Sequence, residues 1–129
     1  MSSFRRFEEI IAWQKARVLF TLLINTTETS PLKNDFPLRN QMERSCGSVM
    51  DNIAEGFGRM GNGEFVHFLT ISIGSAREFQ SQLYRCLDKK HFTETVFEEL
   101  YNLCEEIGRM LPALIIQLKK SDIKGLKFK

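Results

Sequence analysis

Residues 62–90 read NGEFVHFLTISIGSAREFQSQLYRCLDKK, and this stretch decides the fold. Its apolar and small residues recur every three or four positions, which is the spacing of one face of an α-helix. The positions that share this face are Phe65, Phe68, Leu69, Ser72, Ala76, Phe79, Leu83 and Cys86. At about 1.5 Å per residue, the helix would be about 40 Å long. Gly74 lies in its middle, where glycine is about 1 kcal/mol less favourable than alanine, so we expect another helix to approach closely there.

The same helical period predicts three further helices, over about residues 7–25, 37–58 and 95–120. Their inward positions include Leu38, Met42, Cys46, Val49, Ile53 and Phe57 in the second helix, and Phe97, Leu100, Cys104, Ile107, Leu111, Leu114 and Leu118 in the fourth. The connections are short, so sequential helices must run antiparallel. We therefore predict an all-α protein with an up-down-up-down four-helix bundle over residues 1–120 and a flexible basic tail over 121–129.

Residues with known capping preferences mark the predicted ends of these helices. Glycines 56 and 58 are expected to end the second helix in the left-handed conformation. Asn62 is a candidate N-cap for the third helix, and Thr95 with Glu98 has the spacing of a capping box for the fourth. Pro112 should kink the fourth helix or end it early.

The composition is that of an ordinary globular domain. The chain has 129 residues, of which 43% are hydrophobic and 26% charged, with a formal net charge of +2. Three scattered cysteines are too few for a disulfide framework and are expected to be buried thiols. The N-terminus has no apolar signal region, and no stretch approaches the ~18 uncharged apolar residues of a membrane span. We expect a cytoplasmic protein.

The first helix carries more apolar surface than one bundle stripe needs. Its apolar residues are Phe7, Ile10, Ile11, Ala12, Trp13, Ala16, Val18, Leu19, Phe20, Leu22, Leu23 and Ile24. A bundle helix buries roughly a third to a half of its circumference. The surplus indicates either an interface with another subunit, with Trp13 as its anchor, or a helix sunk deeper into its own bundle.

Two short motifs match known sites but lack the required context. Residues 56–61, GFGRMG, fit a dinucleotide fingerprint, yet a helix precedes them and no parallel sheet is predicted. Glu64 and His67 have the Glu-x-x-His spacing of di-iron bundles, which need two such pairs and two further glutamates. The only other histidine, His91, has Asp88 three positions before it. We predict no metal, no cofactor and no catalytic residues, so not an enzyme.

A polar stripe runs beside the apolar faces of the second and third helices. It consists of Arg44, Ser48, Asn52, Glu55, Arg59, Ser75, Glu78 and Gln82. A buried network that sets register or oligomeric state is one interpretation, because polar groups inside a bundle must be hydrogen-bonded. A solvated face with ion pairs such as Glu55 with Arg59 is the second, and a catalytic pair of Glu55 with Glu78 is the third.

Positive charge is concentrated at the C-terminus. Five lysines and one aspartate give residues 119–129 a net charge of +4, which leaves −2 for residues 1–118. Such an arm suits contacts with phosphate, and the copies in an oligomer would add their fields. The candidate nucleic-acid contacts are Arg5, Arg6, Arg39, Lys89, Lys90, Lys119, Lys120, Lys124, Lys127 and Lys129.

The order of motifs resembles the four-helix-bundle proteins encoded in intervening sequences of 23S rRNA genes. The matching pieces are Trp13-Gln14-Lys15-Ala16, Phe36-Pro37, Gln41-x-x-Arg44, Asn52-Ile53-Ala54-Glu55-Gly56-Phe57-Gly58-Arg59, Glu64-Phe65-x-x-Phe68-Leu69, Gly74-Ser75-x-x-Glu78 and Gln80-x-Gln82-Leu83. They cover about residues 7–118. The Asn-Ile-Ala-Glu-Gly block followed by Gly-Ser-x-x-Glu is the most specific part.

This resemblance implies a homopentamer of antiparallel bundles. The family is similar to the accessory variability proteins of diversity-generating retroelements, which bind nucleic acid and a reverse transcriptase. The leading hypothesis is therefore a homo-oligomeric, RNA- or DNA-binding accessory protein of a reverse transcriptase. A second hypothesis is an oligomeric scaffold without nucleic-acid binding, which would use the acidic residues Glu94, Glu98, Glu99, Glu105 and Glu106 to recognise a protein. An enzyme that uses Glu55 and Glu78 is the third.

Overall fold

The computed structural model describes residues 4–59 and 61–128, and the side chains of these residues as far as Ser121. Four long helices make up the described chain: α1 (Ile11–Glu28), α2 (Phe36–Phe57), α3 (Asn62–Asp88) and α4 (Glu94–Phe128). Two short 3₁₀ turns, η1 (Phe7–Glu9) and η2 (Pro31–Asn34), precede α1 and α2.

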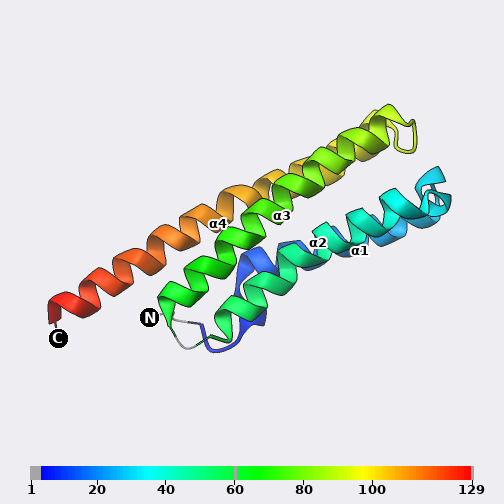
Figure 1. Cartoon of the computed structure of the whole chain (residues 1–129). Coiled ribbons are helices and arrows are strands. Elements are labelled where there is room, and N and C mark those ends of the chain that lie inside the picture. The colour runs from blue at the N-terminus through cyan, green and yellow to red at the C-terminus, as the bar shows by residue number, and fades with distance from the viewer. Residues whose placement is uncertain (1–3, 60, 129) are drawn as a thin grey trace.

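The four helices form the predicted antiparallel bundle (Figure 1). Each helix packs on the next one along the chain, α1 also packs on α4, and the contact between α2 and α3 is the most extensive. One end of the molecule contains the start of the chain, the α2–α3 turn and the C-terminal end of α4 (Figure 1). The η2 segment and the α3–α4 turn lie at the other end.

The core is made by the predicted apolar stripes. On α3, the stripe positions Phe65, Leu69, Ser72, Ala76, Phe79, Leu83 and Cys86 are all buried, and Phe68 is half-buried. On α2 and α4, every predicted inward position is buried except Phe57, which is half-buried. The three cysteines are buried free thiols, as expected.

The glycines near the end of α2 act differently from the prediction. Gly58 follows α2 with φ −72°, and no described glycine lies in the left-handed region, so the expected left-handed ending is wrong. Gly56 is buried inside α2. A Cβ built there would lie 2.7 Å from Cβ of Phe68 and 3.1 Å from the Phe65 ring. Gly56 is therefore needed because α2 and α3 approach closely at this point.

The caps of α3 and α4 also differ from the prediction. Asn62 is the first residue of α3 rather than its N-cap, and its side-chain amide donates to the carbonyl of Leu118 at 3.2 Å. Thr93, not Thr95, caps α4, because its hydroxyl accepts a hydrogen bond from the amide of Val96 at 3.2 Å. The hydrogen bond from Asn62 to Leu118 joins the start of α3 to α4.

Pro112 does not end α4. The helix continues through it to Phe128, although a proline inside a helix removes one backbone hydrogen bond. Residues 121–128 therefore continue α4 in their backbone. The prediction of a flexible tail stays a prediction, since the side chains after Ser121 and all of Lys129 lie outside the described residues.

Gly74 contradicts the expectation of a close helix contact. A Cβ at this position would meet nothing within 4 Å in the described structure. Its place in the middle of α3 has no explanation in the packing of the single chain.

Replacing Gly56 should disturb the α2–α3 contact. We expect Gly56→Ala to lower the free energy of unfolding by about 1–3 kcal/mol, because the added methyl group overlaps Phe68. Chemical unfolding followed by circular dichroism measures this change. The matched control is Gly63→Ala on α3, where a Cβ meets nothing within 4 Å. A Gly56→Ala variant as stable as this control would contradict the proposed role.

Candidate functional site

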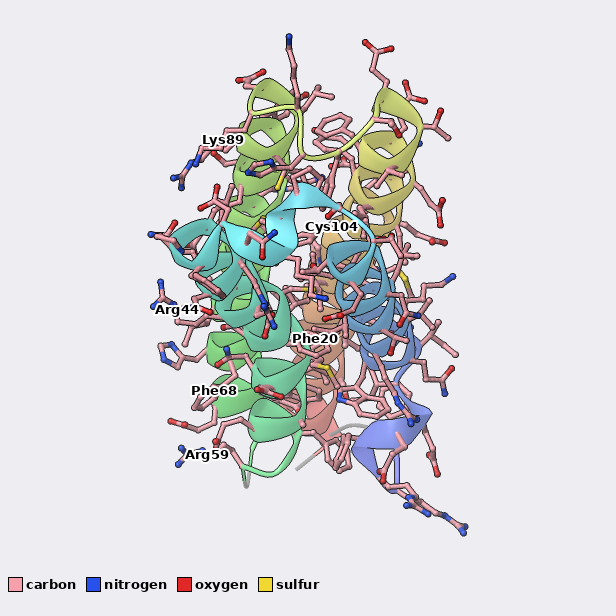
Figure 2. The ribbon with its side chains drawn as sticks, turned by 90° about the vertical axis from the view of Figure 1, so that its right-hand side faces the viewer. Phe20, Arg44, Arg59, Phe68, Lys89 and Cys104 are labelled. Atoms are coloured by element: carbon pink, nitrogen blue, oxygen red, sulfur yellow. The ribbon has the colours of Figure 1, made fainter. Side chains whose placement is uncertain are left out.

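The basic residues predicted to contact nucleic acid do not form one surface. Arg5, Arg6, Lys119 and Lys120 belong to the end with the chain start and the last turns of α4, whereas Arg39, Lys89 and Lys90 belong to the opposite end (Figures 1 and 2). The two groups are separated by the length of α3, about 40 Å. The side chains of Lys124 and Lys127 and the whole of Lys129 lie outside the described residues.

Three of these cations are held by carboxylates of their own chain. Arg6 lies 2.9 Å from Glu8, and the Arg39 guanidinium lies 3.1 Å from Glu43. Lys89 lies 2.7 Å from Asp35. The side chains of Arg5, Lys90, Lys119 and Lys120 make no ion pair within the described residues, and all four residues are exposed. Three of these four unpaired cations lie at the end with the chain start.

Hydrogen bonds to Asp35 join the segment before α2 to the turn between α3 and α4. Lys89 Nζ donates to Asp35 Oδ2 at 2.7 Å, and His91 Nε2 lies 2.9 Å from the same oxygen. Because a carboxylate only accepts hydrogen bonds, this histidine nitrogen is the donor. The hydrogen bonds from Lys89 and then His91 lower the pKa of Asp35 to about 2. This Asp35 cluster closes the end of the bundle where α2 begins and α3 ends.

The middle of the predicted polar stripe is a hydrogen-bonded seam between α2 and α3. The hydroxyl groups of Ser48 and Ser75 lie 2.8 Å apart. The Asn52 amide donates to the Ser48 hydroxyl and to its carbonyl, both at 2.8 Å. Ser48, Asn52 and Ser75 are half-buried and hydrogen-bonded to one another. This part of the stripe is therefore a polar network rather than a solvated face.

The charged residues of the stripe on α2 are solvated. Glu55 and Arg59 form the predicted ion pair, at 3.2 Å, and both side chains are about half exposed. The Arg59 guanidinium also lies 5.0 Å from the centre of the Phe68 ring (Figure 2). Arg44 points to solvent without an ion pair among the described residues (Figure 2).

The two glutamates considered as a catalytic pair have different partners. Glu55 pairs with Arg59, and Glu78 accepts a long hydrogen bond of 3.5 Å from Gln82. Gln82 is buried and also accepts a hydrogen bond of 2.6 Å from the Ser45 hydroxyl. In the described part of the chain, no three His, Cys, Asp or Glu residues lie where they could hold a metal ion.

The outward side of α1 carries little charge, since only Lys15 and Arg17 are ionisable between residues 11 and 27. Its residues Trp13, Gln14, Arg17, Val18, Thr21, Leu22 and Asn25 line a shallow depression of about 480 Å³. Val18 is 56% exposed, and Ile11 nearby is 50% exposed. Trp13, the predicted anchor, is half-buried and packs edge-on against Phe7 at 5.0 Å. The single chain thus covers part of the surplus apolar surface of α1 and leaves part exposed.

A second depression, of about 570 Å³, lies where α1 meets α2. Phe20 and Gly47 both line it, and a Cβ built on this glycine would lie 3.5 Å from the Phe20 ring. Glu43, Arg44, Asp51 and Asn52 line the rim. An alanine at position 47 would make an ordinary van der Waals contact with Phe20, so the packing does not require glycine there.

The prediction also missed a polar cluster between α3 and α4. Arg77 donates to Glu105 at 2.8 Å and to Gln80 at 2.7 Å, and Gln80 donates to Glu105 at 2.9 Å. The hydrogen bonds from Gln80 and Arg77 hold the pKa of Glu105 below its usual value. A Cβ on Gly108 would lie 3.1 Å from the Arg77 guanidinium, so this glycine makes room for it. The cluster stabilises the α3–α4 contact.

The buried thiols are poor nucleophiles. Burial raises the pKa of Cys86 and of Cys104 to about 12, and it raises the pKa of Cys46 further. None of them is a reactive cysteine, because the thiolate is the reactive form.

Comparison with known proteins is consistent with this architecture. Residues 8–113 match the family model described as 23S rRNA-intervening sequence protein. The chain belongs to this family. No curated protein matches it. Among the described helices, none is long and apolar enough to cross a membrane.

A solved structure shows the same fold as this 23S rRNA-intervening sequence family member. It is the 1.70 Å crystal structure of a protein with unknown function from the S23 ribosomal protein family of Bacteroides thetaiotaomicron VPI-5482. The TM-score is 0.73 at 22% sequence identity, over 81% of this chain and 97% of that chain. At this identity the match supports the bundle and leaves function open.

The Asp35 cluster makes a pH-dependent contribution to stability. Because folding lowers the pKa of Asp35 from 3.8 to about 2, its contribution is complete above about pH 4 and is lost as the pH falls through about 2. We expect Asp35→Asn to lower the free energy of unfolding by about 1–2 kcal/mol at pH 7, since Lys89 is partly solvated. Urea unfolding of both proteins between pH 7 and pH 2 should show the difference shrinking.

The control for this measurement is Asp51→Asn. Asp51 is exposed on α2 and makes no ion pair within the described structure. We expect its replacement to leave stability unchanged at each pH. A difference between wild type and Asp35→Asn that stays constant down to pH 2 would contradict the assignment.

Proposed function

We propose that this protein is a non-enzymatic, homo-oligomeric accessory protein that binds RNA or DNA through phosphate contacts. Its most concrete form is an accessory subunit of the reverse transcriptase of a diversity-generating retroelement, as the resemblance of the sequence implies. The observation that carries the proposal is the set of unpaired cations at the end where α4 extends past the start of α3.

The geometry of that end supports phosphate binding. Asn62, the first residue of α3, bonds to Leu118, so the residues of α4 after Leu118 extend beyond the start of α3 (Figure 1). Lys119 and Lys120 begin this extension and are exposed. Lys124, Lys127 and Lys129 follow in the sequence. Cations that have no carboxylate partner remain available to displace counterions from a nucleic-acid backbone.

The outward side of α1 supports assembly of several copies. Its exposed apolar residues and its scarcity of charge are typical of the centre of an interface. In an assembly the basic ends of several chains would act together, and a small net charge per chain would become a strong local field.

The first test of the proposed assembly is the molecular mass of the protein in solution. We expect light scattering at micromolar concentration to report several times the 15.0 kDa of one chain. The family resemblance predicts five copies. A particle of 15 kDa that persists across concentrations would contradict the proposal.

Binding should depend on salt and on the unpaired cations. We expect affinity for a single-stranded RNA to fall as salt rises, because counterion release drives phosphate binding. The triple variant Arg5→Ala/Lys119→Ala/Lys120→Ala should bind more weakly at low salt. Its plot of log affinity against log salt should be shallower by about 2 for each chain that contacts the RNA. Removal of residues 121–129 should weaken binding further.

A charge-matched control separates this site from net charge. The variant Lys33→Ala/Arg85→Ala/Arg109→Ala removes the same charge from residues that already have partners: Glu28, Gln41 and Glu105. We expect wild-type binding from it. Affinity that does not change with salt, or equal losses in both triple variants, would contradict the proposed site.

An oligomeric scaffold without nucleic-acid binding is the second candidate. Glu94, Glu98 and Glu99 at the start of α4 are exposed and make no ion pair within the described residues, so they offer an acidic surface to a basic protein. Pull-down of the neighbouring gene products from nuclease-treated lysate separates the candidates. A partner retained without RNA, and lost on charge reversal of these glutamates, favours the scaffold.

A further inference from the structure

Gly74 is an exposed glycine in the middle of α3, and no contact within the single chain requires a glycine there. Glycine is unfavourable in the middle of a helix, and nothing lies within 4 Å of a Cβ built at this position. Gly56 and Gly108 differ, because each makes room for a neighbouring group of the same chain. Any atoms that Gly74 accommodates must therefore come from outside the described chain.

The residues around Gly74 form a strip along α2 and α3. We call Ser48, Ile71, Gly74, Ser75 and Glu78 the α2–α3 face. The hydrogen bond between the two serines, 2.8 Å long, keeps their side chains close to the helices. Ile71 is 39% exposed beside them, although it is a large apolar residue. The strip is open enough for another helix to lie close to the backbone of α3.

The outward side of α1 is a suitable second surface. We call Trp13, Gln14, Arg17, Val18, Thr21 and Leu22 the α1 face. Between residues 11 and 27, only Lys15 and Arg17 are ionisable. Lys15 pairs with Glu106 of its own chain at 3.2 Å, while Arg17 has no carboxylate within ion-pair distance in the described structure. The face therefore combines apolar and neutral polar side chains with one cation, Arg17, which lies 6.0 Å from the centre of the Trp13 ring.

We propose that the α1 face of one copy packs on the α2–α3 face of the next copy, with Val18 over Gly74. This inference rests on the homo-oligomer in the proposed function and identifies the surfaces that meet. The two faces differ and lie on different helices. Their contact is therefore head-to-tail, and such contacts form rings or filaments rather than simple two-fold dimers.

Charge complementarity favours this pairing over contacts between identical faces. Glu78 lacks a cationic partner among the described residues, as Arg17 lacks an anionic one. A head-to-tail contact allows these two side chains to pair. Contact between two α1 faces would instead bring Arg17 of each copy onto a face without a carboxylate, where no pair could form.

Disulfide trapping tests the contact directly. The three native thiols are buried, so cysteines introduced on the surface are the ones that react. We expect the double variant Val18→Cys/Gly74→Cys to form intersubunit disulfides on oxidation, seen as a ladder on a non-reducing gel. Each single variant should remain uncrosslinked, and a mixture of the two should give crosslinked dimers. The pair Val18→Cys/Glu98→Cys, with Glu98 exposed on α4, is the control and should give no ladder.

Two further variants test the same contact without crosslinking. Gly74→Leu should reduce the assembly to monomers while circular dichroism shows a folded helical protein, because the single chain has room for the side chain. Gly63→Leu, at another open glycine of α3, should leave the mass unchanged. Arg17→Glu and Glu78→Arg should each weaken assembly at least tenfold, and the double charge reversal should restore it.

The outcomes separate this inference from the proposed function. A monomeric wild type overturns both, whereas disulfides formed by Val18→Cys alone, or unchanged assembly of Gly74→Leu, overturn only the head-to-tail contact. If the ladder forms and RNA binding is absent, the contact stands and the nucleic-acid function fails.

Discussion

The close approach of α2 to α3 at Gly56 is the constraint on which the rest of the bundle depends. A Cβ at this position would lie 2.7 Å from Phe68, so only glycine allows the two helices to pack as they do. Because the helices are close, the small residues Ser48 and Ser75 can bond directly farther along the same seam. Large side chains at these positions would force α2 and α3 apart and uncover the core.

The same constraint explains why the surfaces of the bundle differ. The α2–α3 contact is the most extensive in the molecule, and the small residues Ser48 and Ser75 meet along its outer edge. By contrast, α1 packs less extensively on its neighbours and keeps apolar residues such as Ile11 and Val18 in solvent. One surface therefore combines small polar residues with the exposed Ile71, and the other combines apolar and neutral polar residues with little charge. The unpaired cations predicted to contact nucleic acid lie apart from both surfaces, at the two ends of the bundle.

The helices could be predicted from the sequence because each has a regular apolar stripe, and all but two of the inward positions named on α2, α3 and α4 are fully buried. The exceptions, Phe57 and Phe68, lie near the α2–α3 turn and are half-buried. The caps and glycines were harder to predict. A glycine such as Gly56 has the same sequence signature whether it ends a helix or makes room for a neighbour, and only the packing distinguishes these cases.

The candidate site was less accessible to sequence reasoning, because it depends on contacts across the bundle. The predicted cations are close to basic neighbours along the chain but are divided between the two ends in space. Ion pairs such as Arg39 with Glu43 follow helical spacing and could be anticipated. The pair of Lys89 with Asp35 joins residues more than fifty positions apart, and no local pattern indicates it.

The position of the Asp35 cluster has a consequence for the order of folding. A hairpin of α2 and α3 closes most readily from the short turn that joins them, since short loops lose the least entropy on closure. Asp35 and Lys89 lie at the opposite, open end of this hairpin and meet only when both helices are complete. A contact formed after the rate-limiting step affects mainly the unfolding rate. The Asp35 cluster therefore slows unfolding of the native bundle and leaves its folding rate almost unchanged.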